Sequence, residues 1–205
     1  MKLTTIEALS TGRFKLHFSD GTTTKVERSV VADCGLYSGM ELSEDDMERL
    51  AQTQQAASAK ARAVRIVSAT AVSEKELRRR LRQKGEDAAQ ADAAVDWLKE
   101  LGALDDGALA KRVAQQAYAK GYGPDRIRQA LYQKNIPQEY WDEAMAGLED
   151  NPDAIDRFLR QRLNGAAPDQ KEKQKITDAL RRRGFGWEAI RQGFRRYGAE
   201  LEELE

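Results

Sequence analysis

The side chains that most often carry catalysis or bind metals are scarce in this sequence. It has one histidine, His17, and one cysteine, Cys34, so a zinc site of about four ligands, mostly Cys or His, is excluded. A carboxylate-only magnesium site stays possible in principle, but no tight group of Asp and Glu residues supports one. The glycine-rich phosphate-binding motifs of nucleotide-dependent enzymes are missing as well. We therefore predict that the protein is not an enzyme and uses no metal or cofactor.

His17 and Cys34 themselves are better explained by structure than by chemistry. His17 stands in the alternating stretch FKLHFSDG, where a solvent-facing or cross-strand position is expected. Cys34 has no second cysteine to pair with and no candidate base beside it, so we expect a small buried hydrophobic side chain.

The chemistry that the sequence does offer is that of cations. Nine basic and two acidic residues lie between Lys60 and Lys84, and nine basic and three acidic residues lie between Lys171 and Arg196, although the formal net charge of the chain is zero. Such clusters can bind phosphates or an acidic protein groove, and solvated helix faces give the same local pattern. The candidate contact residues, called the basic stripe below, are Arg78, Arg79, Arg80, Arg82, Lys84, Arg126, Arg128, Lys134, Arg181, Arg182 and Arg183.

These cations recur because a short helical segment occurs three times in the sequence. The anchor leucines Leu81, Leu131 and Leu180 lie 50 and 49 residues apart, and an apolar residue precedes each by four positions, which makes one buried stripe on a helix. A residue type that tolerates the left-handed conformation follows each helix, namely Gly85, Asn135 and Gly184. Apolar or aromatic residues then recur 6, 10 and 13 positions later: Ala91, Val95, Leu98; Trp141, Met145, Leu148; and Ile190, Phe194, Tyr197.

Helix start signals divide these copies into units of three helices. Ser73 with Glu76 resembles a capping box, and Pro124 and Pro152 stand at first helical positions. We predict three tandem three-helix repeats at residues 47–102, 105–148 and 151–199, followed by an acidic tail at 200–205. Because a unit of about 45 residues buries little surface alone, the repeats should stack into an elongated, curved array. Packing roles are expected for the three tryptophans, Trp97, Trp141 and Trp187.

Residues 1–46 differ in kind from the rest and predict a small β-containing module. Phe14, Leu16 and Phe18 share one face of a strand, the Asp20-Gly21 pair signals a hairpin turn, and the return strand covers about residues 22–27. Residues 3–9 supply a third strand, since a lone hairpin is only marginally stable. The first 50 residues carry six basic and nine acidic residues, so this module is a poor nucleic-acid candidate and is expected to dock a partner or brace the next domain.

Composition sets the remaining expectations. Charged residues make up 33% of the chain and the mean hydropathy is −0.72, which favours a mostly helical, water-exposed protein. No apolar run approaches the length of a membrane span, and the first residues lack the apolar core of a signal peptide. We expect a cytoplasmic protein, no membrane association and a monomer.

Four segments of the helical region resemble a known family. They read SEKELRRRLRQKG, LGALDD and KGYGPDRIRQALYQKNI, and a third-unit segment reads ALRRRGFGWEAI. Together they are similar to the RecX family, bacterial regulators of the RecA recombinase, over residues 50–198, and GYGPDRIRQAL is the most specific element. The resemblance implies three tandem three-helix repeats, with an N-terminal β-containing extension similar to that of longer members.

The resemblance also implies a function. It implies binding in the helical groove of the RecA–single-stranded DNA filament, inhibition of the ATPase and of strand exchange, some direct affinity for DNA, and a role in homologous recombination, DNA repair and the SOS response. The segment GALAKRVAQQAYAKGYG departs from the family by carrying alanine where Phe and Arg are common, and Glu86 stands where the other repeats have Ile136 and Phe185. Two other classes fit the same residues: a freestanding DNA- or RNA-binding helical protein, and a protein–protein adaptor.

Overall fold

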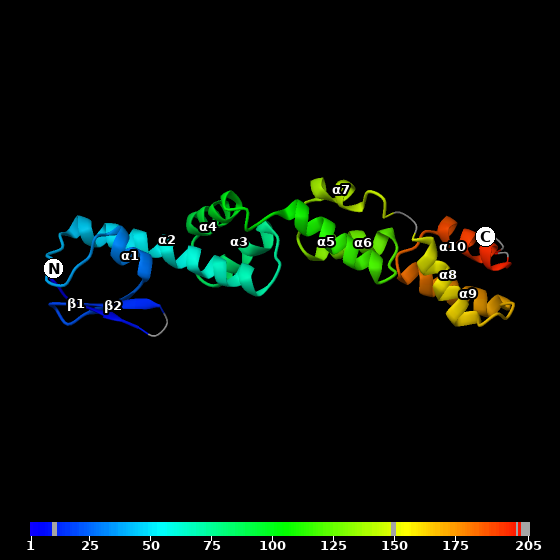
Figure 1. Ribbon diagram of the computed structural model, residues 1–205, viewed down its shortest axis with the longest axis horizontal. Coiled ribbons are helices and arrows are strands. Elements are labelled where there is room, and N and C mark those ends of the chain that lie inside the picture. Colours follow the sequence, from blue (N-terminus) through cyan, green and yellow to red (C-terminus); the bar gives the residue numbers. More distant parts are fainter. Residues whose placement is uncertain (10–11, 149–150, 200, 202–205) are drawn as a thin grey trace. The chain divides into compact units, whose positions relative to one another are not determined.

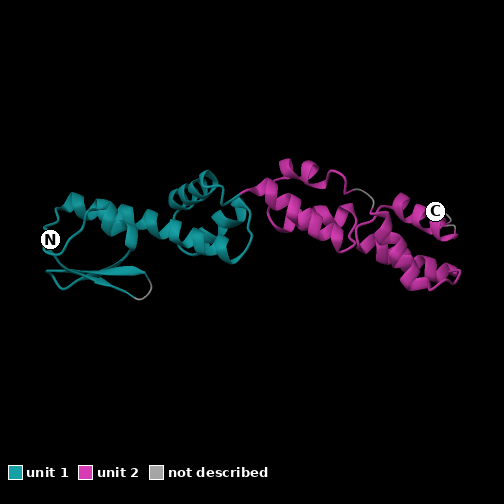
Figure 2. Ribbon diagram, viewed as in Figure 1, with its two compact units in different colours: residues 1–104 teal, residues 105–205 magenta. Residues whose placement is uncertain are grey.

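Three antiparallel strands open the chain, and helices form the rest of it (Figure 1). The computed structural model describes residues 1–9, 12–148, 151–199 and 201, so most of the predicted acidic tail lies outside the described residues. The chain divides into two units, residues 1–104 and 105–205 (Figure 2). Among the described residues, no helix is long and apolar enough to cross a bilayer.

The predicted β module is confirmed. Strands β1 (Leu3–Ala8), β2 (Arg13–Phe18) and β3 (Thr23–Glu27) form one sheet in that order, and each pairs antiparallel with its neighbour. Leu16 and Phe18 are buried, and Phe14 packs against the same core, as the alternation predicts. Asp20 closes the β2–β3 turn by accepting hydrogen bonds from the backbone N–H and the hydroxyl of Thr22, at 2.9 and 2.7 Å.

Two helices follow the sheet, the short α1 (Arg28–Asp33) and the long α2 (Glu44–Ala69). A capping box starts α2: Ser43 Oγ accepts from the Asp46 N–H and Asp46 Oδ2 accepts from the Ser43 N–H, both at 3.1 Å. Leu50 and Ala57, in the first half of α2, belong to the core of the β module, whereas Ala59 and Ala63 belong to the core of the first repeat. The sequence boundary at residue 46 therefore falls inside one continuous helix.

The first repeat is completed by α3 (Glu74–Gln83) and α4 (Ala88–Glu100). Ser73 begins α3 by accepting a hydrogen bond from the Glu76 N–H at 3.2 Å. The anchor residues Leu77 and Leu81 are fully buried, and the chain leaves α3 through Gly85 at a φ of +91°. That backbone conformation favours glycine, which explains the residue type at the repeat's turn.

The second unit holds the other two repeats. The second repeat consists of α5 (Asp106–Ala119), α6 (Pro124–Gln133), the 3₁₀ turn η1 (Gln138–Tyr140) and α7 (Trp141–Met145), so its third helix is short. The third repeat consists of α8 (Pro152–Leu163), α9 (Gln170–Arg182) and α10 (Trp187–Tyr197). The predicted turn residues Asn135 and Gly184 adopt φ angles of +54° and +86°.

Each repeat has its own core, built from the predicted apolar positions. Val95, Ile127, Leu131, Ile190 and Phe194 are fully buried. Trp97 and Trp141 are half-buried against the cores of their repeats, and Trp141 Nε1 donates to the Ile136 carbonyl at 3.1 Å. The threefold periodicity therefore reports the cores of three small helical domains.

Candidate partner-binding surface

The two residues with catalytic side-chain types lie in structural positions. Cys34 is buried in the core of the β module. His17 faces outward on β2, where its Nε2 lies 3.1 Å from Glu7 Oε2 on the neighbouring strand. Within the described residues, no group of three or more His, Cys, Asp or Glu side chains could hold a metal ion. The basic stripe is therefore the candidate site.

In the first repeat, Arg78 is held by three acids. Its guanidinium lies 3.3 Å from Glu74 on the same helix, and 3.0 and 3.3 Å from Asp92 and Asp96 on α4. Arg82 lies 3.6 Å from the same Asp92. These ion pairs join α3 to α4, so Arg78 has a structural use that the sequence alone does not separate from binding.

Glu76 holds two more arginines of the stripe. Its Oε1 lies 2.7 Å from Arg79 Nη2 and 2.7 Å from Arg80 Nε. The hydrogen bonds from Arg79 and then from Arg80 lower the pKa of Glu76 from 4.5 to about 2, since they favour the charged carboxylate. Arg79 is still 52% exposed and Arg80 37% exposed, so both can reach a partner if the Glu76 contacts are exchanged.

In the second repeat, the stripe residues sit on α6 and have local partners. Arg126 donates to the side chain of Gln129 and its guanidinium lies 5.8 Å from the ring centroid of Tyr122. Arg128 Nη1 lies 3.1 Å from Asp125 Oδ1, an exposed pair that contributes little to stability. Lys134 is the C-cap residue of α6.

The third repeat contributes two exposed members of the stripe. Arg181 and Arg182 are exposed in the last turn of α9, and the described part of the chain gives neither of them an ion-pair partner. The next residue, Arg183, is half-buried, and its guanidinium lies 4.8 Å from the ring centroid of Phe158. Like the exposed Lys84 of the first repeat, Arg181 and Arg182 are therefore well placed for contact with a partner.

Backbone hydrogen bonds join the basic ends of the second and third repeats. The Gly123 N–H donates to the Arg183 carbonyl at 2.9 Å, and the Asp125 N–H donates to the Gly184 carbonyl at 3.1 Å. A Cβ at Gly123 would lie far inside van der Waals contact of the Gly184 carbonyl oxygen, so only glycine fits this approach. The most specific motif of the sequence, GYGPDRIRQAL, thus builds a junction between two repeats.

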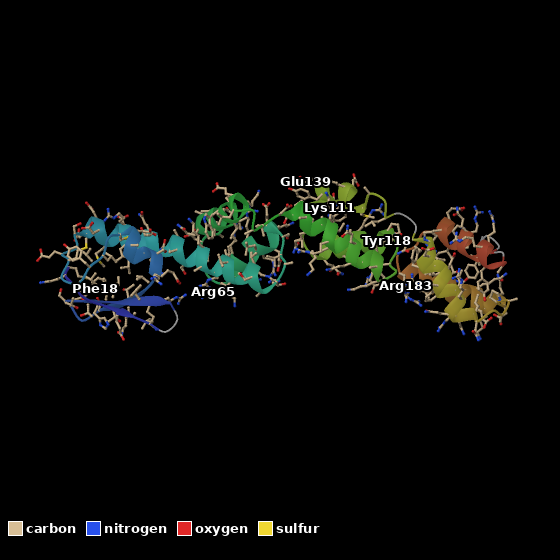
Figure 3. All side chains as sticks on the ribbon, viewed as in Figure 1. Phe18, Arg65, Lys111, Tyr118, Glu139 and Arg183 are labelled. Atoms are coloured by element: carbon tan, nitrogen blue, oxygen red, sulfur yellow. The ribbon has the colours of Figure 1, made fainter. Side chains whose placement is uncertain are left out.

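A second contact supports the same junction. Asn151 is buried, and its side-chain amide donates to the Tyr118 carbonyl at the end of α5, at 2.9 Å. Figure 3 labels Tyr118 and Arg183, which lie on the two repeats that meet here. The junction brings Arg126 of α6 and Arg183, the C-cap residue of α9, to one place, whereas Arg78–Arg82 belong to the other unit.

Sequence reasoning missed several candidate surface residues. Tyr132 is 71% exposed on α6, directly after the anchor Leu131, where the other repeats carry Arg82 and Arg181. Arg65 on α2 and Arg13 on β2 lie outside the aligned helices of the repeat, so no repeat alignment could point to them. An exposed aromatic beside basic residues is the signal that could have identified Tyr132.

Comparison with known proteins identifies the repeats. Family models for the first, second and third three-helix domains of RecX match residues 59–98, 105–145 and 149–193. The chain belongs to the RecX family. Its members are regulatory proteins, and the regulatory protein RecX of Chlorobaculum tepidum is 37% identical over 134 residues, 63% of this chain and 82% of that protein. The regulatory protein RecX of Cronobacter sakazakii is 34% identical over 148 residues, 66% of this chain and 90% of that protein.

Solved structures show the same fold. A crystal structure of a regulatory protein RecX superposes with a TM-score of 0.71 at 23% identity, covering 93% of this chain and 98% of that one. A RecX structure from Lactobacillus salivarius gives a TM-score of 0.66 at 16% identity, covering 71% of this chain and 98% of that one.

The structure also explains where this RecX sequence departs from its own repeat pattern. Ile136 and Phe185 are buried after the turns of the second and third repeats, and Glu86 takes that place in the first. The Glu86 side chain is only 10% exposed, and its Oε1 lies 2.8 Å from Arg62 Nε on α2. The alanines of the α5 segment are used for packing, since Ala110, Ala114 and Ala117 are buried in the core of the second repeat.

Proposed function

We propose that this protein is a negative regulator of the RecA recombinase that binds the RecA–single-stranded DNA filament and inhibits its ATPase activity and strand exchange. Membership of the RecX family supports a regulatory role. The observation that carries the finer proposal is the junction between α6 and α9, where backbone hydrogen bonds hold the basic ends of two repeats in a fixed relation. Cations held in place lose less conformational entropy on binding than cations on separate, mobile elements.

The mechanism is steric and electrostatic, without catalysis. A filament presents the same acidic or phosphate groups at regular intervals, so basic faces repeated along one chain can bind several of them at once and gain avidity from modest contacts. In this mechanism the protein acts as a monomer in the cytoplasm, where the recombinase and its DNA are found. The exposed Arg181 and Arg182 make the first contacts.

The test is the RecA ATPase on single-stranded DNA, measured with and without this protein at two salt concentrations. Wild-type protein should inhibit it, and the variant Arg181→Glu with Arg182→Glu should inhibit it at least tenfold more weakly. The matched control is Lys171→Glu with Lys175→Glu, which makes the same charge change in the first half of α9. Equal inhibition by both folded variants would remove a specific role of Arg181 and Arg182 from the mechanism.

Direct measurement of binding to naked DNA and to the filament, made beside the ATPase assay, separates the alternative classes. If wild-type protein binds naked DNA and leaves the ATPase unchanged, it is a freestanding nucleic-acid-binding protein. If it binds neither filament nor DNA, an adaptor function remains.

A further inference from the structure

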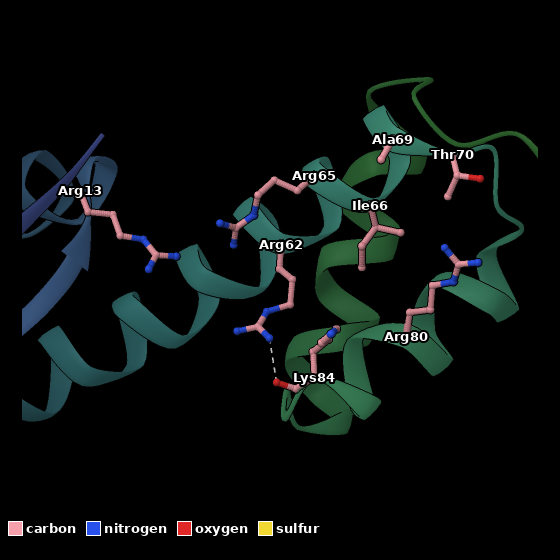
Figure 4. A pocket seen from close by; sticks show the side chains of 8 residues that line it. All are labelled: Arg13, Arg62, Arg65, Ile66, Ala69, Thr70, Arg80 and Lys84. Atoms are coloured by element: carbon pink, nitrogen blue, oxygen red, sulfur yellow. Dashed lines mark hydrogen bonds between the residues drawn. The ribbon is translucent and has the colours of Figure 1, made fainter. Parts of the chain in front are cut away.

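A cationic pocket lies in the first unit, apart from the α6–α9 junction. Its volume is roughly 530 Å³, and its wall is formed by β2 together with the consecutive helices α2 and α3 (Figure 4). Arg13 comes from the start of β2, four lining side chains come from the last turns of α2, and Arg80 and Lys84 come from the end of α3. The polar lining residues are Arg13, Arg62, Arg65, Thr70, Arg80 and Lys84.

The charges of this pocket are only partly compensated. Arg13 lies 2.8 Å from Glu27, Arg62 lies 2.8 Å from Glu86 and Arg80 lies 2.7 Å from Glu76. Within the described residues, Arg65 and Lys84 have no ion-pair partner, and no Asp or Glu lines the pocket. Five cations against three acids leave a local charge of about +2, which an anion would neutralise.

Part of the pocket is held in place before any ligand arrives. Arg62 Nη1 donates to the Lys84 carbonyl at 2.8 Å, as drawn in Figure 4, and this bond ties the end of α3 to α2. Arg80 is anchored through Glu76. Guanidinium groups fixed in this way present paired N–H donors, which match the oxygens of a phosphate group.

A second hollow, of roughly 670 Å³, indicates the kind of molecule to which a bound phosphate would belong. Arg65 lines both hollows, and the wall of the second one includes Ala61, Val64 and Trp97, with Lys60 Nζ 5.2 Å from the Trp97 ring centroid. Single-stranded nucleic acid alternates charged phosphates with flat, largely apolar bases that stack on aromatic side chains. The wall of the second hollow also carries two acids, Glu27 and Asp33. An acidic peptide would satisfy the cations of the first pocket but would be repelled by these carboxylates.

We propose that the cationic pocket binds a backbone phosphate of single-stranded nucleic acid, with a neighbouring base in the hollow beside Trp97. The site goes beyond the proposed function because it requires no recombinase. It also changes the interpretation of the acidic N-terminal module: through Arg13, that module completes a strand-binding site whose other walls belong to the first repeat.

The test is direct binding of the full-length protein to a fluorescently labelled single-stranded oligothymidylate, followed by anisotropy over a range of salt concentrations. Arg65→Ala with Lys84→Ala should weaken binding roughly tenfold or more and lower the log–log salt slope by about one unit. The matched control is Arg49→Ala with Lys75→Ala, which removes one exposed cation from each of α2 and α3 outside the pocket. This control should bind within about twofold of wild type.

Three further measurements keep the proposal open to refutation. Thermal unfolding of the pocket variant should lie close to that of wild type, because the removal of like-charge repulsion is offset by the loss of a favourable cation at the C-cap of α3. Polyglutamate of equal charge should compete poorly with the oligonucleotide. If it competes as well as the oligonucleotide, the site binds acidic proteins and the proposal fails.

Inhibition of the RecA ATPase by the same pocket variant is a separate readout. Loss of strand binding with inhibition intact supports this site. Unchanged strand binding overturns this proposal and leaves the proposed function standing.

Discussion

Replacing Gly123 by alanine should break the junction between the second and third repeats while both repeats stay folded. The new Cβ would lie 2.6 and 2.7 Å from the Gly184 carbonyl carbon and the Phe185 nitrogen, and closer still to the Gly184 oxygen. Backbone cannot rotate out of the way as a flexible side chain can. The two segments must therefore separate by about 1 Å to reach an ordinary contact distance.

The cost of this separation can be worked out from the contacts it disturbs. The Gly123–Arg183 and Asp125–Gly184 hydrogen bonds are each worth about 1 kcal/mol net. Overpacking that cannot be relieved by rotamer changes adds about 1–3 kcal/mol. We therefore expect the junction to be destabilised by about 3–5 kcal/mol, a factor of about 100 or more in its opening equilibrium.

Gly186 supplies a matched control. Like Gly123 it is the N-cap residue of a helix, α10, with a negative φ and no side-chain cap, but a Cβ added there would have no atom within 4 Å. Hydrogen–deuterium exchange of the full-length protein should show faster exchange around residues 123–127 and 183–186 in Gly123→Ala and little change in Gly186→Ala. Similar exchange in the two variants would refute the reasoning, because the shared N-cap effect would then explain all of it.

Two other substitutions test single features of the surface. Glu76→Gln removes a carboxylate whose pKa is lowered from 4.5 to about 2 by hydrogen bonds from Arg79 and Arg80. That pKa shift corresponds to about 3 kcal/mol of folding free energy. Solvent screening at the half-exposed arginines reduces the expected loss of stability to about 1–2 kcal/mol. Because the pKa of Glu76 is lower in the folded protein, urea unfolding should show the full loss of stability above about pH 4.5. The difference between variant and wild type should shrink as the pH falls toward 2. A loss that does not depend on pH would contradict this reasoning, and Glu48→Gln is the control. Tyr132→Ala should change stability by less than about 0.5 kcal/mol, since the side chain is 71% exposed. The same substitution should weaken inhibition of the RecA ATPase, because exposed aromatic residues often contribute most to binding. Full inhibition by this variant would remove α6 from the contact surface.

The sequence predicted the repeats well because their cores depend on local spacing. Leu77 and Leu81 are four residues apart on α3, and that spacing alone places both on the buried face. The left-handed turns at Gly85, Asn135 and Gly184 were equally predictable from the sequence, since few residue types tolerate a positive φ. The strand pairing of the β module followed from alternation and one hairpin signal.

Features that depend on contacts between distant segments could not be predicted in the same way. Arg62 and Glu86 are 24 residues apart in sequence, and only the packing of α2 against the end of α3 brings them together. The same holds for Asp92 and Asp96, which bind Arg78 from another helix. Nothing in the local pattern of α2 shows that one helix would serve two cores.

The recurrence of the basic residues has a structural cause as well as the proposed functional one. When the three helices are aligned on their anchor leucines, the one stripe position that is basic in all three copies is the C-cap, held by Lys84, Lys134 and Arg183. A cation there is favourable in any helix, because the C-terminal carbonyl groups carry a partial negative charge. Recurrence at that position therefore says little about a partner. The same partial charge favours Arg181 and Arg182 in the last turn of α9, whereas Arg65 lies before the last turn of α2. The charge substitutions at these three positions decide between a solvated surface and a binding surface.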